Sequence, residues 1–127
     1  MRIIGHGIDV VKIAEIQAEV DSTNKRWTEQ FCSADERAHA GTTPTRYRYY
    51  ASCYAAKEAV VKALGKGFAG DITWRGIEIL RRPGGAPYIR LRDEVLELAD
   101  NMGIAEWYIS ISYLDDVAMA SVIAVGE

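Results

Sequence analysis

A carboxylate and an ammonium stand four residues apart near the middle of this sequence, at Glu58 and Lys62. Residues four apart on a helix lie one above the other, so both side chains would share one face. The small residues Ala51 and Ala55 would lie beside the pair, and the three features together suggest the floor of a ligand-binding site. On its own, a Glu–Lys pair at this spacing is far more often part of a solvated helix surface, so the spacing alone does not establish a site.

The helix that must position this pair is predicted over residues 44–64. Strong helix formers dominate it, with Thr43 as the expected N-cap, Pro44 in the first helical position and Gly65 as the C-cap. On another face small and branched apolar residues recur at helical spacing and predict a buried stripe. The members of this stripe are Ala56, Ala59, Val60 and Ala63.

A second carboxylate of interest is Asp9, which follows a predicted strand over residues 2–8. Apolar residues recur at helical spacing from Val10 onward, so Asp9 would lie at a strand-to-helix junction. There it could cap the helix by accepting hydrogen bonds from its first N–H groups, or bind a hard cation from the end of the strand. His6 and His39 have no partners at metal-ligand spacing and are expected to be ordinary residues.

Composition predicts one compact domain spanning residues 1–127. The chain has 49% apolar and 26% charged residues, which is typical of a globular protein with a real core. Its 15 Lys and Arg residues against 18 Asp and Glu residues argue against a protein that coats nucleic acid, so no nucleic-acid partner is expected. Basic residues nevertheless gather locally, where they could bind phosphate or an acidic partner. These clusters are Lys25–Arg26, Arg46 with Arg48, Arg81–Arg82, and Arg90 with Arg92.

Cysteine usage and the N-terminal residues predict a cytoplasmic location. Cys32 and Cys53 have no metal-ligand spacing and are expected to be reduced thiols. Residues 1–7 do not resemble a signal peptide, and no apolar run reaches membrane-spanning length, so no membrane association is expected.

The remaining pattern indicates an α+β fold. In chain order it predicts two short helices within residues 21–40, strands at 74–81 and 88–91, a helix at 93–102, and strands at 107–113 and 117–125. Ser33 and Glu36 form a predicted capping box, and Pro83–Gly85 predicts the turn of a hairpin. The last strand is apolar on both faces, which predicts that both faces are covered, one of them at a subunit interface.

Six runs of residues, in order along nearly the whole chain, resemble holo-[acyl-carrier-protein] synthases, the short type of 4'-phosphopantetheinyl transferase. The runs are Gly7–Val10, Tyr54–Ala59, Lys62–Gly67, Ile77–Leu80, Gly85–Tyr88 and Ser110–Ser112. The resemblance implies the fold of that family, an antiparallel sheet with a long central helix. It also implies transfer of the phosphopantetheine arm of coenzyme A to a serine of an apo acyl carrier protein, which releases adenosine 3',5'-bisphosphate.

The resemblance assigns roles to the residues singled out above. Asp9 and Glu58 match the two carboxylates that bind Mg²⁺, and Lys62 matches the ammonium that binds the pyrophosphate. Gly65 and Gly67 match glycines that allow the nucleotide to approach the backbone. The base that takes the serine proton is implied to be Glu58 or a water molecule held by the metal.

Four further positions match places where the family contacts the coenzyme: Arg46, Lys66, Ser112 and Tyr113. Several residues depart from the pattern of the family. Cys53 replaces an Arg, Lys66 replaces a Thr or Ser, Tyr113 replaces a His, and Glu15 replaces a basic residue used to bind the carrier. Lys66 and Arg46 are expected to make up for the cations missing at Cys53 and Tyr113.

Short members of the family are homotrimers with active sites between subunits, so the resemblance implies a trimer, with Arg46 serving the site of a neighbour. The departures also motivate an alternative, a paralogue that binds coenzyme A or a carrier protein without turnover.

Overall fold

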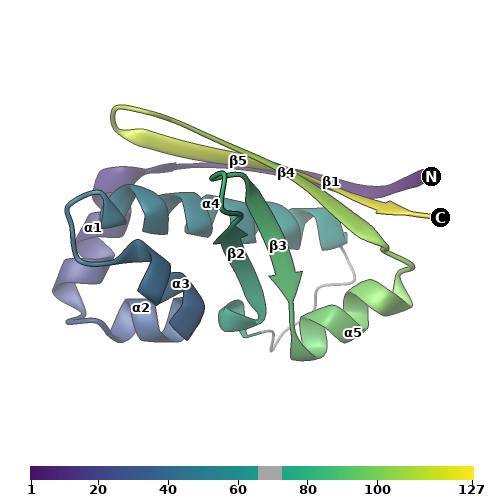
Figure 1. The fold of residues 1–127 in the computed structure, drawn as a ribbon, viewed down its shortest axis with the longest axis horizontal. Coiled ribbons are helices and arrows are strands. Elements are labelled where there is room, and N and C mark those ends of the chain that lie inside the picture. Colours follow the sequence, from purple (N-terminus) through teal and green to yellow (C-terminus); the bar gives the residue numbers. More distant parts are fainter. Residues whose placement is uncertain (66–72) are drawn as a thin grey trace.

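The structure, a computed structural model, describes residues 1–65 and 73–127. A three-stranded antiparallel sheet of order β1-β5-β4 lies along the long helix α4, and a β2-β3 hairpin crosses the other side of that helix (Figure 1). Helices α1, α2 and α3 gather at one end of the molecule and α5 at the other (Figure 1). The bounds are β1 Arg2–Lys12, α1 Ile13–Ser22, α2 Arg26–Phe31, α3 Ala34–Ala40, α4 Arg46–Leu64, η2 Trp74–Gly76, β2 Ile77–Arg81, β3 Pro87–Leu91, α5 Asp93–Asn101, β4 Glu106–Leu114 and β5 Val117–Gly126.

Strand β1 is longer than the sequence predicts, and this changes the setting of Asp9. The strand continues to Lys12, because Val10 and Val11 extend the antiparallel ladder opposite Met119 and Ala118. Lys12, and not Asp9, is the N-cap residue of α1. The interpretation of Asp9 as a helix cap, and its placement at a strand-to-helix junction, are therefore wrong.

Two other boundaries differ from the prediction. Helix α4 begins at Arg46 with Thr45 as its N-cap, because a turn in which Arg46 N donates to Thr43 O precedes the helix. The segment Trp74–Gly76 is a 3₁₀ helix and not the start of a strand. The hairpin itself, the helix α5 and the last two strands form where they are predicted.

Two glycines let β1 lie directly against α4. A Cβ atom at Gly5 would overlap the carbonyl oxygen of Ala63, and one at Gly7 would overlap that of Ala59. Side chains alternate along a strand, so Asp9 faces the helix as these glycines do. The close approach of β1 to α4 therefore places the Asp9 carboxylate beside side chains of the neighbouring turn of α4.

The predicted apolar stripe of α4 is confirmed, since Ala56, Ala59, Val60 and Ala63 are all buried. The expectation that Ala51 and Ala55 lie open beside Glu58 and Lys62 is wrong. Ala51 and Ala55 are fully buried in the hydrophobic core, because elements pack against α4 on most of its sides.

Two local predictions are confirmed by hydrogen bonds and burial. Ser33 Oγ accepts from Glu36 N at 3.2 Å and Glu36 Oε1 accepts from Ser33 N at 2.9 Å, which completes the capping box. Cys32 and Cys53 are free and buried, and burial raises the pKa of the Cys32 thiol to about 12. Burial also raises the pKa of the Cys53 thiol well above its usual value, so both thiols stay protonated.

The two faces of the sheet differ in exposure. On the face toward α4, Ala118, Ala120, Val122 and Ala124 of β5 are buried. The outer face carries apolar side chains that are 38% to 69% exposed and are brought together by the strand register. These are Ile8, Val10, Tyr108, Leu114, Met119 and Ile123.

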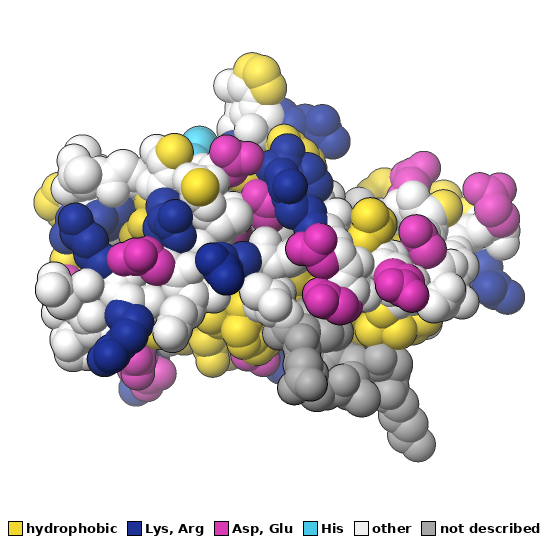
Figure 2. All heavy atoms as spheres, turned by 90° about the horizontal axis from the view of Figure 1, so that it is seen from below, with side chains coloured by type: hydrophobic (Ala, Val, Ile, Leu, Met, Phe, Trp, Pro, Cys, Tyr) yellow, Lys and Arg dark blue, Asp and Glu magenta, His cyan; other side chains and the backbone are white. Residues whose placement is uncertain are grey.

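On the side away from the sheet, Lys and Arg side chains lie among Asp and Glu side chains (Figure 2). None of the helices within residues 1–65 and 73–127 combines the length and the apolar character that a membrane-spanning helix needs.

Candidate active site

A groove of about 490 Å³ lies between β1, α1 and α4, and two of the predicted site residues, Asp9 and Glu58, line it. The strand contributes one side of the groove, the helices the other, and β5 closes one end. Its lining residues are Asp9, Val10, Val11, Lys12, Glu15, Tyr54, Glu58 and Val117.

Lys62, one turn after Glu58 on α4, contacts the strand that carries Asp9. Its Nζ donates to the carbonyl oxygen of Ile8 at 2.8 Å and to Asp9 Oδ1 at 3.1 Å. The Lys62 side chain is 53% exposed, whereas that of Asp9 is 19% exposed. An ion pair this open to water contributes little to stability, so the ammonium can leave it for a ligand at low cost.

Glu58 is held in an environment that disfavours its charged form. Burial raises the pKa of its carboxyl group, the negative charge of Asp9 raises it further, and Lys62 partly offsets both. Both carboxylates line the same groove, so their negative charges repel each other. A bound cation would relieve their repulsion.

The donor set fits a hard divalent cation of the Mg²⁺ type. Mg²⁺ commonly takes one or two carboxylates from the protein and fills its other positions with water and substrate phosphate. Asp9 and Glu58 supply two carboxylates on one groove. Among residues 1–65 and 73–127, no group of three or more His, Cys, Asp and Glu residues comes together that could hold a metal ion. The groove thus offers the partial ligand set that Mg²⁺ accepts.

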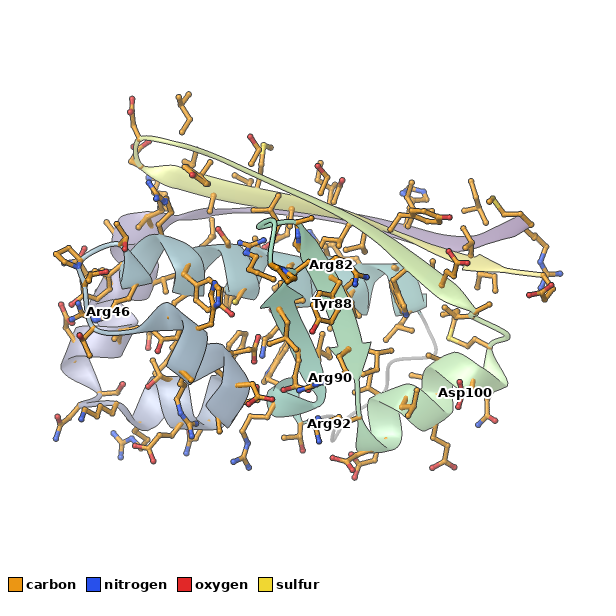
Figure 3. All side chains as sticks on the ribbon, in the orientation of Figure 1. Arg46, Arg82, Tyr88, Arg90, Arg92 and Asp100 are labelled. Carbon is orange, nitrogen blue, oxygen red and sulfur yellow. The ribbon has the colours of Figure 1, made fainter. Side chains whose placement is uncertain are left out.

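The structure also places the predicted coenzyme-binding residues. Gly65 ends α4 with a φ of 60°, which glycine adopts without strain, so its predicted role as a C-cap is confirmed. Lys66 and Gly67 lie outside the described residues. Arg46 lies at the opposite end of α4 (Figure 3), about 18 Å along the helix axis from Glu58 at ~1.5 Å per residue.

Arg46 is already engaged in holding the start of α4. Its guanidinium donates to the carbonyl oxygens of Thr42 and Thr43 and to the hydroxyl oxygen of Tyr47, and it stacks on the Tyr47 ring. Within one copy of the chain, Arg46 and Lys62 therefore cannot hold the same phosphate group.

Ser112 and Tyr113 are adjacent in β4 but point to opposite sides of the sheet. Ser112 is exposed on the outer face, opposite Met119. Tyr113 faces the α4 side, where the guanidinium carbon of Arg48 lies 4.2 Å from the centre of its ring. Neither residue lines the groove of Asp9 and Glu58, so the structure does not bring them together with those carboxylates in one copy.

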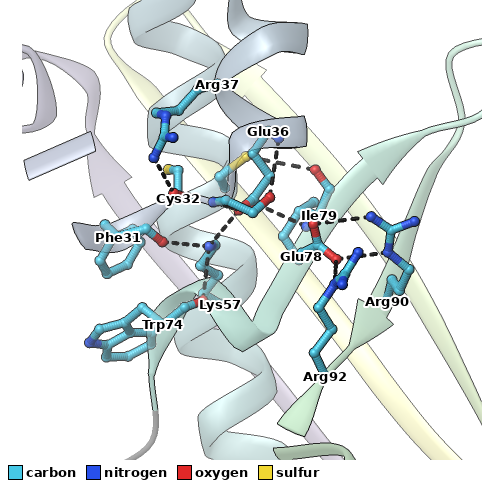
Figure 4. A network of polar contacts seen from close by, with 12 residues as sticks. Phe31, Cys32, Glu36, Arg37, Lys57, Trp74, Glu78, Ile79, Arg90 and Arg92 are labelled. Atoms are coloured by element: carbon cyan, nitrogen blue, oxygen red, sulfur yellow. Dashed lines mark hydrogen bonds and ion pairs between the residues drawn. The ribbon is translucent and has the colours of Figure 1, made fainter. Parts of the chain in front are cut away.

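The residue that the sequence reasoning missed is Lys57, which directly precedes Glu58. Its side chain is fully buried and forms an ion pair of 2.8 Å with the fully buried Glu36 (Figure 4). Lys57 Nζ also donates to the carbonyl oxygens of Phe31 and Trp74. The second oxygen of Glu36 accepts from the backbone N–H of Ile79 at 3.0 Å. One buried pair thus ties α2, α3, η2 and β2 to the helix that carries Glu58 and Lys62.

A signal for this pair was present in the sequence. Lys57 lies four residues after Cys53 and three before Val60, which places it on a buried face of the helix. A charged residue in such a position needs a buried partner. Glu36 was interpreted only as part of the capping box, and nothing local in the sequence connects it with Lys57.

A neighbouring network centres on Glu78 of β2 (Figure 4). The Glu78 carboxylate is almost fully buried and accepts hydrogen bonds from the guanidinium groups of Arg90 and Arg92 at 2.7 Å. Burial raises the pKa of Glu78, but the hydrogen bonds from Arg90, Arg92 and Ser33 outweigh it and lower the pKa to about 2. This acid is therefore a structural one, unlike Glu58.

Comparison with known proteins agrees with this fold. The profile of the 4'-phosphopantetheinyl transferase superfamily matches residues 5–121. The chain belongs to this superfamily, and the prediction of an enzyme of the phosphopantetheinyl transferase class is confirmed.

Within this superfamily, the proteins most readily compared in sequence are holo-[acyl-carrier-protein] synthases. The holo-[acyl-carrier-protein] synthase of Beutenbergia cavernae is 40% identical over 98% of both chains. That of Desulforudis audaxviator is 37% identical over 98% of this chain and 94% of its own. The resemblance found in the sequence motifs is thereby confirmed.

Solved structures show the same α+β fold. The holo-[acyl-carrier-protein] synthase of Neisseria meningitidis superposes with a TM-score of 0.87 at 26% identity, over 97% of this chain and 98% of its own. That of Helicobacter pylori, solved in complex with coenzyme A, gives a TM-score of 0.80 at 31% identity, over 94% of this chain and 99% of its own. The predicted fold class is confirmed at this level.

Proposed function

We propose that this protein transfers the 4'-phosphopantetheine arm of coenzyme A to a serine hydroxyl of an apo acyl carrier protein, with Mg²⁺ as cofactor. The products are the holo carrier protein and adenosine 3',5'-bisphosphate. The observation that carries the proposal is the groove that Asp9 and Glu58 both line, with Lys62 in an ion pair with Asp9. Two comparisons support the proposal. The related proteins are named holo-[acyl-carrier-protein] synthases, and the Helicobacter pylori relative was solved in complex with coenzyme A.

In the proposed reaction the serine oxygen attacks the pyrophosphate phosphorus that carries the pantetheine arm. A new P–O bond forms to serine, and the P–O bond to the adenosine-bearing phosphate breaks. Asp9 and Glu58 would hold the Mg²⁺ ion, which would neutralise negative charge on the phosphate oxygens. Lys62 exchanges its contacts with Ile8 and Asp9 for a charge-assisted hydrogen bond to the pyrophosphate.

Glu58 is the proposed acceptor of the serine proton. It lines the groove together with Asp9, and a water molecule held by the metal is the other acceptor that the resemblance implies. Val11 and Tyr54 line the groove beside these groups.

The proposed active form is a homotrimer. The outer face of the sheet leaves the apolar side chains of β1, β4 and β5 exposed, and a contiguous apolar face of this kind is typical of an interface. The resemblance implies that such an assembly brings Arg46, which lies far from the groove in one copy, to the groove of a neighbour. Light scattering at micromolar concentration tests this assembly, and a monomer mass would contradict it.

The free, buried state of Cys32 and Cys53 supports a reducing location such as the cytoplasm. The proposed protein substrate in that location is an acyl carrier protein of fatty acid biosynthesis.

The test is a mass measurement on an apo acyl carrier protein incubated with coenzyme A, Mg²⁺ and the enzyme. We expect the carrier to gain the mass of phosphopantetheine, and Asp9→Ala and Glu58→Ala each to abolish the gain while leaving the melting temperature close to that of the wild type. Binding of coenzyme A in calorimetry without a mass gain on any carrier would instead support the alternative, a non-catalytic paralogue. Transfer by Asp9→Ala at the wild-type rate and low Mg²⁺ would refute the metal assignment.

A further inference from the structure

A second groove, of about 260 Å³, lies between β1, α1, α2 and α4, next to the groove of Asp9 and Glu58. Its lining consists of two aromatic rings, two carboxylates and two aliphatic side chains. These residues are Val11, Glu15, Ile16, Glu19, Trp27 and Tyr54. Val11, Glu15 and Tyr54 also line the first groove, so the two grooves meet at these three residues.

The ring of Tyr54 is held in place by its neighbours. Its centre lies 5.2 Å from the centre of the Phe31 ring, with the two ring planes 25° apart. Phe31 is buried, and its ring also stacks on that of Trp27 at 4.7 Å. The carbonyl oxygen of Phe31 accepts a hydrogen bond from the buried Lys57 Nζ at 2.6 Å (Figure 4). The position of the Tyr54 ring is therefore set before a ligand binds.

The hydroxyl group of Tyr54, in contrast, forms no hydrogen bond with any of the residues 1–65 and 73–127. The hydroxyl group of Tyr49 on the same helix differs, since it donates to the carbonyl oxygen of Ile79 at 2.9 Å. No buried side-chain oxygen or nitrogen in the described ranges lacks a hydrogen bond, so the Tyr54 hydroxyl is accessible to solvent. Burial and the negative charges of Glu58 and Asp9 raise the pKa of Tyr54, so this hydroxyl stays protonated. It is a hydrogen-bond donor that is free for a ligand.

Tyr54, Glu58 and Lys62 follow one another along α4 at intervals of four residues, so they lie in a row on one side of the helix. Lys62, at one end of the row, is the proposed contact of the pyrophosphate. In a displacement at phosphorus, the attacking oxygen and the leaving oxygen lie in line on opposite sides of the phosphorus atom. A coenzyme held at the Lys62 end therefore leaves the Tyr54 end to the serine of the carrier protein. This step rests on the proposed function.

The charges at the junction of the two grooves determine which oxygen Tyr54 can bind. Glu15 and Glu19 border the second groove, and its lining residues include no Lys or Arg within the described parts of the chain. A phosphate or carboxylate group would be repelled there, whereas an uncharged oxygen would not. A peptide carbonyl oxygen is the uncharged acceptor that every segment of a protein substrate offers.

We propose that the Tyr54 hydroxyl donates a hydrogen bond to a backbone carbonyl oxygen of the carrier protein, next to the serine that is modified. The fixed ring presents the donor at the junction of the two grooves, one turn of α4 before Glu58. The contact orients the segment that carries the serine and adds affinity for the protein substrate. It adds none for coenzyme A, which binds toward the Lys62 end of the row.

The experiment compares Tyr54→Phe with the wild type in steady-state transfer to a purified apo acyl carrier protein. The change removes a single oxygen atom and keeps the ring that stacks on Phe31. Tyr50→Phe is the matched control, because Tyr50 lies one turn earlier on α4, also contacts the Trp27 ring and lines neither groove. KM is measured for the carrier and for coenzyme A, each at a saturating concentration of the other. The melting temperature of each variant verifies that it is folded.

We expect Tyr54→Phe to raise KM for the carrier about three- to tenfold, the range for loss of one hydrogen bond between uncharged groups. The value of kcat and KM for coenzyme A should stay close to those of the wild type, as should every parameter of Tyr50→Phe. An unchanged KM for the carrier would overturn the proposal. So would a loss confined to kcat, because the hydroxyl would then act on the reacting atoms and not on docking.

Calorimetric titration with the same apo carrier separates this inference from the proposed function. If the wild type binds the carrier without transfer, the proposed function fails, and weaker binding by Tyr54→Phe still supports the contact. Equal affinities of the wild type, Tyr54→Phe and Tyr50→Phe for the carrier would overturn the contact, even where transfer is observed.

Discussion

Helix α4 carries two lysines that form ion pairs five residues apart, and the two pairs have opposite characters. Lys57 and Glu36 are both 0% exposed, and every polar atom of the pair is used inside the protein. Lys62 and Asp9 are 53% and 19% exposed and border the groove with Glu58. The comparison shows how one helix separates its roles: a buried pair fixes the position of the helix, and an exposed pair on the next turn stays free to exchange partners.

The first prediction tests the structural side of this comparison. Lys57→Met should lower the free energy of unfolding by about 3–5 kcal/mol, because it leaves the Glu36 carboxylate buried without its cation. Denaturant unfolding measures the loss. The double variant Lys57→Met/Glu36→Gln should lose less than the sum of the two single variants, since neither partner is then left charged and alone. Additive losses would show that the two residues do not act as a pair.

The matched change on the exposed pair is Lys62→Met, which should have the reverse profile. Its effect on the free energy of unfolding should stay below about 1 kcal/mol, because the pair is largely open to solvent. Transfer to the carrier protein should fall at least about tenfold, since a charge-assisted contact with phosphate contributes about 1.5–3 kcal/mol. Steady-state transfer rates and thermal melts of the same preparations test both statements. A variant that is destabilised but fully active would reverse the roles assigned to the two lysines.

A smaller effect, with a defined pH dependence, is expected at Glu78. Its pKa is lowered from 4.5 to about 2 in the folded protein, so the stability that its charge contributes is present above pH 4.5 and is lost as the pH falls toward 2. Glu78→Gln should cost about 1–2 kcal/mol at pH 7, a modest figure because Arg90 and Arg92 are partly exposed. The difference between variant and wild type in urea unfolding should shrink steadily between pH 5 and pH 2. A cost that does not change over this range would mean that packing, and not charge, is lost.

The parts of the fold that the sequence predicts are those set by local patterns. The capping box of Ser33 and Glu36, the turn at Pro83–Gly85 and the apolar stripe of α4 each depend on residues close together in the chain. The sequence predicts the end of β1 too early, because the apolar residues Val10 and Val11 fit the periodicity of a helix and that of a strand equally well. Their pairing with β5, about 110 residues later, decides between the two.

The candidate site divides in the same way. Short motifs indicate Asp9, Glu58 and Lys62 as site residues, and in the structure Lys62 contacts Asp9. The partner of Lys57 lies 21 residues away in another helix, and the second groove combines Glu19, Trp27 and Tyr54 from three helices. Such groupings arise only from the packing of α4 against its neighbours, which no local pattern encodes.

The pairing of the first and last strands has a consequence for how the chain can be reconnected. Arg2 lies opposite Gly126 in the ladder, so the two ends of the chain emerge side by side at one corner of the sheet (Figure 1). A short linker could join them, and new ends could be opened at the exposed turn between β2 and β3. Such a circular permutant would keep every strand and helix described here while changing the order in which they leave the ribosome.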